Sequence, residues 1–173
     1  EAFVSKLNPI KNWDASLKNE KDFQRHAIEI PLPKLDNGRY IITANTSALK
    51  ENFKAHTLVQ ITNIAMLEHD NVEKKHLQFI DRNNGQPIAN AKVKLEYMYG
   101  NEEVETVNTT ADSNGKLSIT KSKKRRNNAN VKVEASGDVA YYSNLYINNY
   151  YRNYNSKYLF SAKFHLDTLL IYD

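Results

Sequence analysis

The chain contains no cysteine. This absence excludes disulfides, thiolate metal sites and a cysteine nucleophile. No apolar run approaches the roughly 20 residues that a membrane-spanning helix requires, and no signal peptide is visible at the N-terminus. Because Glu1 is not a natural start, we expect the chain to be cut from a longer protein. The formal net charge of +4 is modest. A charge of this size affects solubility and does not by itself indicate a class of binding partner.

The composition that is present favours β-structure. The 173 residues suffice for one domain, or for one domain with a fragment of a neighbour. Hydrophobic residues make up 40% of the chain, which is a little low but enough for a single core. Asn, Lys, Thr and Tyr are abundant, and they favour exposed strands and turns over helices.

The clearest strand pattern lies between Asp81 and Leu117. Asn83–Gly85 predicts a turn, because Asn and Gly tolerate left-handed conformations. Pro87 blocks helix formation and suits the first residue of a strand. The apolar residues that follow alternate with polar ones, at Ala91, Val93, Leu95 and Tyr97. This is the period of a half-buried strand.

The same criteria predict strands over residues 57–67, 75–81, 105–110, 117–119, 130–135, 139–147 and 158–172. Seven or eight strands at such short spacing, separated by turn residues, are typical of an antiparallel sandwich. We therefore predict an all-β, Ig/fibronectin-like antiparallel β-sandwich over residues 57–173.

Residues 1–56 are predicted to form an accessory N-terminal hairpin layer. Residues 26–30 alternate and residues 39–45 are rich in β-branched and aromatic side chains, so both are predicted to be strands. The segment from Pro33 to Gly38 would join them, since Asp36-Asn37-Gly38 is a strong turn signal. Residues 46–55 are interpreted as a connection to the sandwich.

The order of several segments resembles a known family. The segments are Leu32–Ile42, Val59–Ala65, Phe79–Val93, Thr109–Gly115 and Phe164–Asp173. Together they are similar to the N-terminal region of a bacterial, Bacteroidetes-type α-2-macroglobulin-like protein. In that family a segment of the form "lP.L..G.Yii" ends one macroglobulin-like domain and precedes a "D..tG.Pi.nA.V" domain.

This resemblance implies a non-catalytic macroglobulin-like domain of a large protease-inhibitor protein, a protease trap. Residues 1–56 would be the last strands of the preceding domain, and residues 57–173 would be the macroglobulin-like sandwich. The partners would be neighbouring domains of the same polypeptide, with proteases bound only by the full-length parent. The parent would be periplasmic or on the cell surface, held by a lipid anchor outside this segment. The thioester motif of the family, Cys-Gly-Glu-Gln, belongs to a later domain.

The tyrosine-rich tract is the strongest candidate for partner binding, at Tyr141, Tyr146, Tyr150 and Tyr151. Tyrosine rings stack on sugars and anchor protein interfaces. A carbohydrate-binding or adhesive cell-surface sandwich is therefore the alternative function. The simpler interpretation is a strand with exposed phenols followed by a polar loop. Because the apolar residues do not keep one parity, a bulge or turn is expected near Ser143-Asn144.

The remaining polar clusters are interpreted as structural. The basic run Lys121–Arg126 lacks interleaved aromatic residues, so a solvated loop is favoured over nucleic-acid binding. Glu68, His69, Asp70 and Glu73 could hold a cation, but a solvated turn is the simpler interpretation. Asp112–Gly115 resembles the start of a calcium loop and lacks the bidentate Glu, so an Asx-type turn is expected.

No constellation predicts catalysis, a metal or a cofactor. The histidines are dispersed and show no metal-ligand spacing, at His26, His56, His69, His76 and His165. No Gly-x-Ser-x-Gly motif supports a catalytic triad. We therefore expect a protein that is not an enzyme and uses no cofactor.

Overall fold

A computed structural model describes residues 6–16, 21, 22, 24, 26–45, 54–71, 73–99, 103–121, 128–147 and 162–164. The chain divides into two compact units. The first comprises Glu1–Leu35, Ile41–Leu58 and Leu166–Asp173, and the second comprises Asp36–Tyr40 and Val59–His165. We describe each unit by itself.

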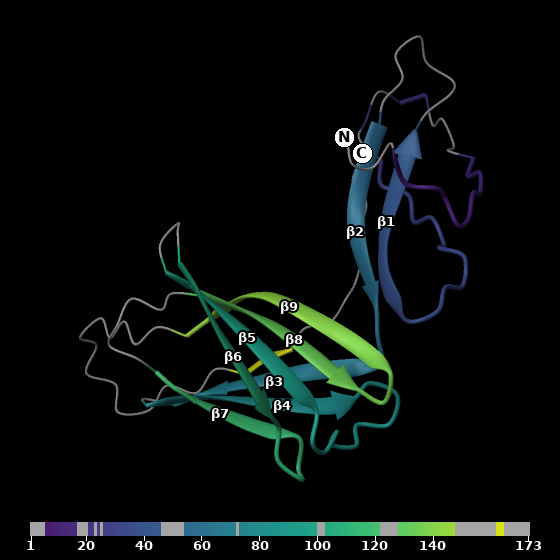
Figure 1. Ribbon diagram of the computed structural model, residues 1–173. Coiled ribbons are helices and arrows are strands. Elements are labelled where there is room, and N and C mark those ends of the chain that lie inside the picture. Colours follow the sequence, from purple (N-terminus) through teal and green to yellow (C-terminus); the bar gives the residue numbers. More distant parts are fainter. Residues whose placement is uncertain are drawn as a thin grey trace. The chain divides into compact units, whose positions relative to one another are not determined.

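The second unit is an antiparallel β-sandwich of two four-stranded sheets (Figure 1). One sheet has the order β10-β3-β4-β7 and contains β3 (Ile64–Asp70), β4 (Lys74–Asp81), β7 (Lys116–Thr120) and β10 (Ala162–Phe164). The other has the order β6-β5-β8-β9 and contains β5 (Lys92–Tyr99), β6 (Glu103–Thr110), β8 (Asn128–Ala135) and β9 (Asp138–Tyr146). Every pairing within these two sheets is antiparallel. The predicted all-β sandwich is confirmed.

The core lies between the two sheets and follows the alternation seen in the sequence. The largest fully buried side chains are Phe79, Ile64, Met66, Leu77, Ile147, Val131 and Val133. Burial of each such side chain stabilises the fold by about 1.5–3 kcal/mol. The Tyr142 hydroxyl donates a 2.8 Å hydrogen bond to the Ile64 carbonyl oxygen, which connects β9 of one sheet to β3 of the other.

The turn before β7 is the expected Asx turn. The Asp112 Oδ1 atom accepts hydrogen bonds from the backbone N–H groups of Asn114 and Lys116, each at 2.8 Å. Gly115 has a φ of 68°, and its carbonyl oxygen accepts a 2.8 Å bond from the Phe79 N–H. The turn is therefore attached directly to the strand at the centre of the core.

The bulge expected near Ser143-Asn144 is also present. The register between β8 and β9 shifts between Ala129 and Val131, and Asn144 has a φ of 60°. Asn is among the residues that adopt this left-handed conformation most readily. The bulge lets Tyr142 and Leu145 both point into the core, although they are three residues apart.

The predicted N-terminal hairpin is wrong in one arm. Residues 26–36 contain no strand, and β1 (Gly38–Asn45) pairs instead with β2 (Lys54–Ile61) in a two-stranded sheet. Figure 1 shows these two strands running in opposite directions. Pro31 and Pro33 lack the backbone N–H that a ladder needs. β2 contains the β-branched residues Thr57, Val59 and Ile61, which favour strands.

The strand predicted over residues 57–67 is two strands. β2 ends at Ile61 and β3 begins at Ile64. Thr62 and Asn63 separate them because both are held by hydrogen bonds to Asp138. Of the strand predicted over residues 158–172, only β10 falls within the described residues. The described part of the chain holds no helix long and apolar enough to cross a membrane.

Candidate functional site

Asp138 is the centre of a hydrogen-bonded cluster at the start of β9. It follows the tight turn of Ser136 and Gly137, whose φ angles are 50° and 81°. Positive φ at both central residues is the geometry of a type I′ hairpin turn, for which Gly is well suited. The turn places the Asp138 carboxylate at the end of the β8–β9 hairpin.

Four donors satisfy this carboxylate. The Oδ2 atom accepts from Asn37 Nδ2 at 2.9 Å, Thr62 Oγ1 at 2.9 Å and the Asn63 N–H at 2.7 Å. The Oδ1 atom accepts from the Val139 N–H at 2.7 Å. Asn37 precedes β1, and Thr62 and Asn63 follow β2. One carboxylate therefore fixes the points where β1 begins and where β2 ends.

Gln60 makes a second link to the same hairpin. Its side-chain Oε1 accepts a 2.7 Å bond from the Tyr141 N–H, and its Nε2 donates a 3.3 Å bond to the Tyr141 carbonyl oxygen. β9 is an edge strand of its sheet. The amide of Gln60 thus takes the place of a neighbouring strand at this position.

The Tyr141 ring lies beside two cations. The Arg39 guanidinium carbon is 4.5 Å from the ring centroid, within cation–π distance, and the Lys132 Nζ atom is 5.8 Å from it. A hydrogen bond between Lys132 and Glu134 raises the pKa of Lys132 and lowers the pKa of Glu134. Tyr141 keeps 38% of its surface exposed.

A shallow depression of about 270 Å³ adjoins this ring. It is lined by Asn37, Gly38, Arg39, Gly137, Asp138, Val139 and Tyr141. The lining combines a guanidinium, a phenol, a side-chain amide and the Asp138 carboxylate, whose oxygens already accept hydrogen bonds, and all of these residues belong to the second unit. Such a surface can hold an anion or a polar ring but contains no nucleophile paired with a base.

Two of the four tyrosines predicted to bind a partner lie on one face. Tyr141 stands opposite Lys132 and Tyr146 opposite Asn128, and both of these β8 residues point away from the core. Tyr146 is 52% exposed. Tyr150 and Tyr151 lie outside the described residues, as does the basic run from residue 122 onward.

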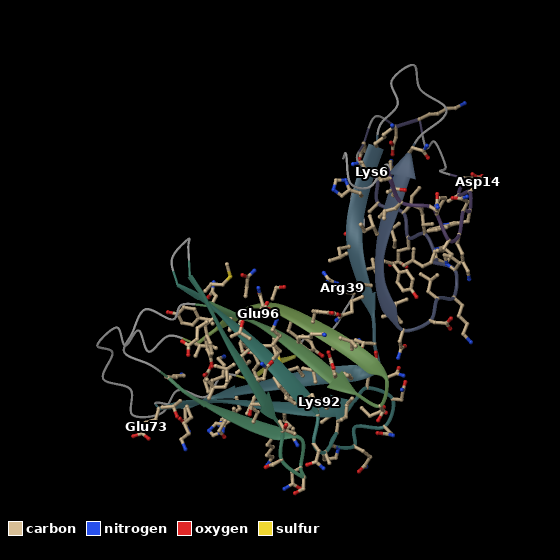
Figure 2. The ribbon with its side chains drawn as sticks, in the orientation of Figure 1. Lys6, Asp14, Arg39, Glu73, Lys92 and Glu96 are labelled. Carbon is tan, nitrogen blue, oxygen red and sulfur yellow. The ribbon has the colours of Figure 1, made fainter. Side chains whose placement is uncertain are left out.

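The outer face of the β6-β5-β8-β9 sheet is rich in charged side chains. Figure 2 labels Lys92 and Glu96 on β5, and Arg39 on β1. A second depression, of about 400 Å³, is lined by Lys92, Val93, Lys94, Asn108, Thr109, Thr110, Lys132 and Glu134. Three lysines and one glutamate give this depression a positive balance.

The acidic turn is not a simple solvated turn. Lys75 is 3% exposed, and its Nζ atom lies 2.8 Å from Glu68 Oε2 and 3.0 Å from Asp70 Oδ2. Lys121 Nζ lies 3.0 Å from Asp70 Oδ1. The carboxylates are thus paired with lysines. Sequence reasoning missed Lys75, although its parity with Leu77 and Phe79 already placed it on the inward face of β4.

The described histidines form no metal centre. His69 and His76 are cross-strand partners whose rings stack at 5.9 Å, and His26 Nε2 lies 2.7 Å from the Asp22 carboxylate. That hydrogen bond lowers the pKa of Asp22. Among the described residues, no group of three or more His, Asp or Glu side chains could hold a metal ion. His165 lies outside them.

Comparison with known proteins gives a family match over part of the chain. A model described as "Domain of unknown function (DUF6795)" matches residues 82–157, which is less than half of the chain. The matched range runs from the loop after β4 through β9 and includes the Asp138 carboxylate. No characterised protein and no solved structure matched the chain.

Proposed function

We propose that this chain is a non-catalytic structural and interaction domain of a large bacterial α-2-macroglobulin-like protease trap. The parent would be exported to the periplasm or the cell surface and held there by a lipid anchor outside this segment. The sandwich would separate and hold neighbouring domains, and the parent would bind proteases. The order of the sequence segments and the all-β sandwich support this proposal.

The observation that carries the proposal is the apolar surface of the first unit. None of its described residues is buried. Four large apolar side chains are instead exposed, namely Leu7 at 46%, Ile10 at 72%, Trp13 at 41% and Leu58 at 56%. Exposed apolar side chains in a unit whose described residues include none that is buried favour contact with a further domain. The last strands of a preceding macroglobulin-like domain would have this property.

Trp13 provides the test, because it is the only tryptophan of the chain. The chain is extended by the upstream residues of its reading frame, with any added tryptophan replaced by Phe. The proposal expects that acrylamide quenches Trp13 strongly in the 173-residue chain and weakly in the extended one. Equal quenching in both would contradict it.

The reading frame itself gives the second test. A lipoprotein signal upstream, with further sandwich domains and a Cys-Gly-Glu-Gln motif downstream, would agree with a protease trap. A short parent that ends soon after Asp173 would contradict the trap. The carbohydrate-binding alternative would then be favoured, since Tyr141 and Tyr146 are exposed on one face.

A further inference from the structure

One row of side chains crosses the outer face of the β6-β5-β8-β9 sheet. The register places Asn108, Lys94, Lys132 and Tyr141 directly opposite one another on successive strands. Adjacent strands lie about 4.8 Å apart, so Lys94 and Tyr141 are separated by about 10 Å. Arg39 then lies over the Tyr141 ring. We call these five residues the Lys94–Arg39 row.

The row carries an electrostatic cost that a purely structural face would avoid. Lys94 and Lys132 are like charges in directly opposite positions, an arrangement that destabilises a sheet. Each is paired along its own strand, Lys94 with Glu96 at 2.6 Å and Lys132 with Glu134. The side chains of these pairs are partly exposed, so water screens them and a bound anion can compete with them.

Arg39 is arranged to bind a planar anion. Its guanidinium carbon lies over the Tyr141 ring, and Arg39 is exposed. Among the residues that the structure describes, no carboxylate forms an ion pair with it. The cation–π contact holds the guanidinium at the ring, and the N–H groups of a guanidinium match a carboxylate bidentately.

The polar character of the face limits the type of ligand. Protein interfaces have an apolar core. On the described part of the second unit, only Met98, Tyr141 and Tyr146 are large exposed hydrophobic residues, so this face does not resemble such an interface. Single-stranded nucleic acids require open aromatic faces for base stacking, and Arg39 covers one face of Tyr141. Amide and hydroxyl groups such as those of Asn108 and Thr110 suit the hydroxyl groups of sugars.

We propose that the Lys94–Arg39 row binds an acidic polysaccharide, with a uronate carboxylate on the Arg39 guanidinium and neighbouring carboxylates on Lys132 and Lys94. This inference is independent of the protease-trap proposal, because it concerns the second unit alone. A negative result would leave the trap proposal unchanged.

The test uses the 173-residue chain and polygalacturonate, with fully methyl-esterified polygalacturonate as the uncharged ligand of the same backbone. Calorimetric titration is expected to detect binding of the acid form and at least tenfold weaker binding of the ester. Binding of the two forms with equal affinity, or binding of neither, would overturn the proposal. Equal or tighter binding of oligodeoxythymidylate would also overturn it and would indicate a phosphate-binding surface.

Three variants locate the site. Arg39→Gln should weaken polygalacturonate binding about tenfold to a hundredfold, the range of one charge-assisted bidentate contact. Arg39→Lys should weaken it nearly as much, because the planar fork is lost while the charge remains. Lys116→Gln removes one exposed positive charge from β7 of the other sheet and should leave the affinity unchanged. Equal weakening by Arg39→Gln and Lys116→Gln would show that only net charge matters and would refute the row. Unfolding curves of the variants confirm that each is folded.

Discussion

Gly115 is a position where the backbone leaves no room for a side chain. Its φ is 68°, and a Cβ atom would lie 2.5 Å from the Phe79 carbonyl oxygen and 3.0 Å from that of Ile88. Both obstacles are backbone atoms of the folded sandwich, and the Phe79 carbonyl oxygen is itself hydrogen-bonded to the Ile88 N–H. The turn before β7 therefore requires glycine for its conformation and also for its closeness to β4.

We predict that Gly115→Ala lowers the free energy of unfolding by about 3 kcal/mol or more, since left-handed strain and overpacking add. Gly85→Ala is the matched control. Gly85 has a φ of 73°, but nothing lies within 4 Å of the point that a Cβ atom would occupy, so only the conformational cost of about 1–2 kcal/mol applies. Urea unfolding followed by circular dichroism measures both. Equal losses would show that crowding at Gly115 is unimportant.

Asp138 is the second residue whose role is fixed by its neighbours. Thr62, which donates to it, is 5% exposed, and the Asn63 N–H also donates to it. We predict that Asp138→Ala costs about 1–3 kcal/mol, because the buried Thr62 hydroxyl loses its acceptor. Asp138→Asn should cost less, since one oxygen remains. The control Asp14→Asn changes the same charge at an exposed site and should be within about 0.5 kcal/mol of the parent. An Asp138→Ala protein as stable as the control would contradict the cluster.

At the scale of elements, one end of the β3-β4-β7 sheet is closed by an ion network. Lys75 points inward between Glu68 and Asp70, whose side chains are 10% and 27% exposed. Lys75→Met would leave these carboxylates without their shared cation. Removing one partner of a buried pair costs about 3–5 kcal/mol. Partial exposure and the remaining Lys121 contact reduce the expected loss here to about 2–3 kcal/mol.

Lys74→Met is the matched control for this prediction, because Lys74 is the exposed neighbour on the same strand. Denaturant unfolding of the two variants should differ by about 2 kcal/mol or more. Equal stability of the Lys75→Met and Lys74→Met variants would contradict the prediction. It would mean that the ion network stabilises the fold no more than an apolar side chain at position 75 does. A higher salt concentration should change the loss of unfolding free energy in Lys75→Met only slightly, since buried ion pairs are screened weakly.

The alternation of apolar and polar residues predicted several strands correctly. It failed where strand formation depends on a pairing partner that is distant in the sequence. β5 followed from the alternation of Val93, Leu95 and Tyr97, and the break in parity near Ser143 predicted the bulge in β9. The segment 26–30 alternates equally well, yet it forms no strand. Pro31 and Pro33, which follow this segment, lack the N–H groups that a ladder needs, and β1 pairs with β2 instead. Alternation reports which residues face inward, but it does not report which strand supplies the hydrogen bonds.

The candidate site was predictable only in part for the same reason. Tyr141 and Tyr146 were expected from composition, and both are exposed on one face. Arg39 and Asp138 were not expected, because their roles depend on contacts across roughly 100 residues of chain, as the Asn37–Asp138 hydrogen bond shows. A single aspartate after a Ser-Gly turn gives no sequence signal of the donors that converge on it.

At the scale of the whole molecule, the two units differ in how much surface they bury. All buried hydrophobic residues among those described belong to the second unit, whereas β1 and β2 are partly buried at most. An isolated two-stranded sheet is marginally stable in water, and no residue of β1 or β2 is fully buried. We therefore predict that amide hydrogens of β1 and β2 exchange much faster than those of β5 and β8. Hydrogen-exchange mass spectrometry measures this, and similar protection in both regions would contradict it.

The same experiment on a longer chain examines the proposed domain organisation. If residues 1–56 are the last strands of a preceding macroglobulin-like domain, upstream residues would cover their exposed apolar side chains and protect the β1–β2 sheet. Exchange in β1 and β2 should then slow about tenfold for each 1.4 kcal/mol of added stability, while exchange in β5 and β8 stays the same. Protection that rises equally in both units would indicate general stabilisation by the added chain. No change in β1 and β2 would mean that the apolar residues Ile10 and Trp13 have another partner, and the preceding-domain assignment would be wrong.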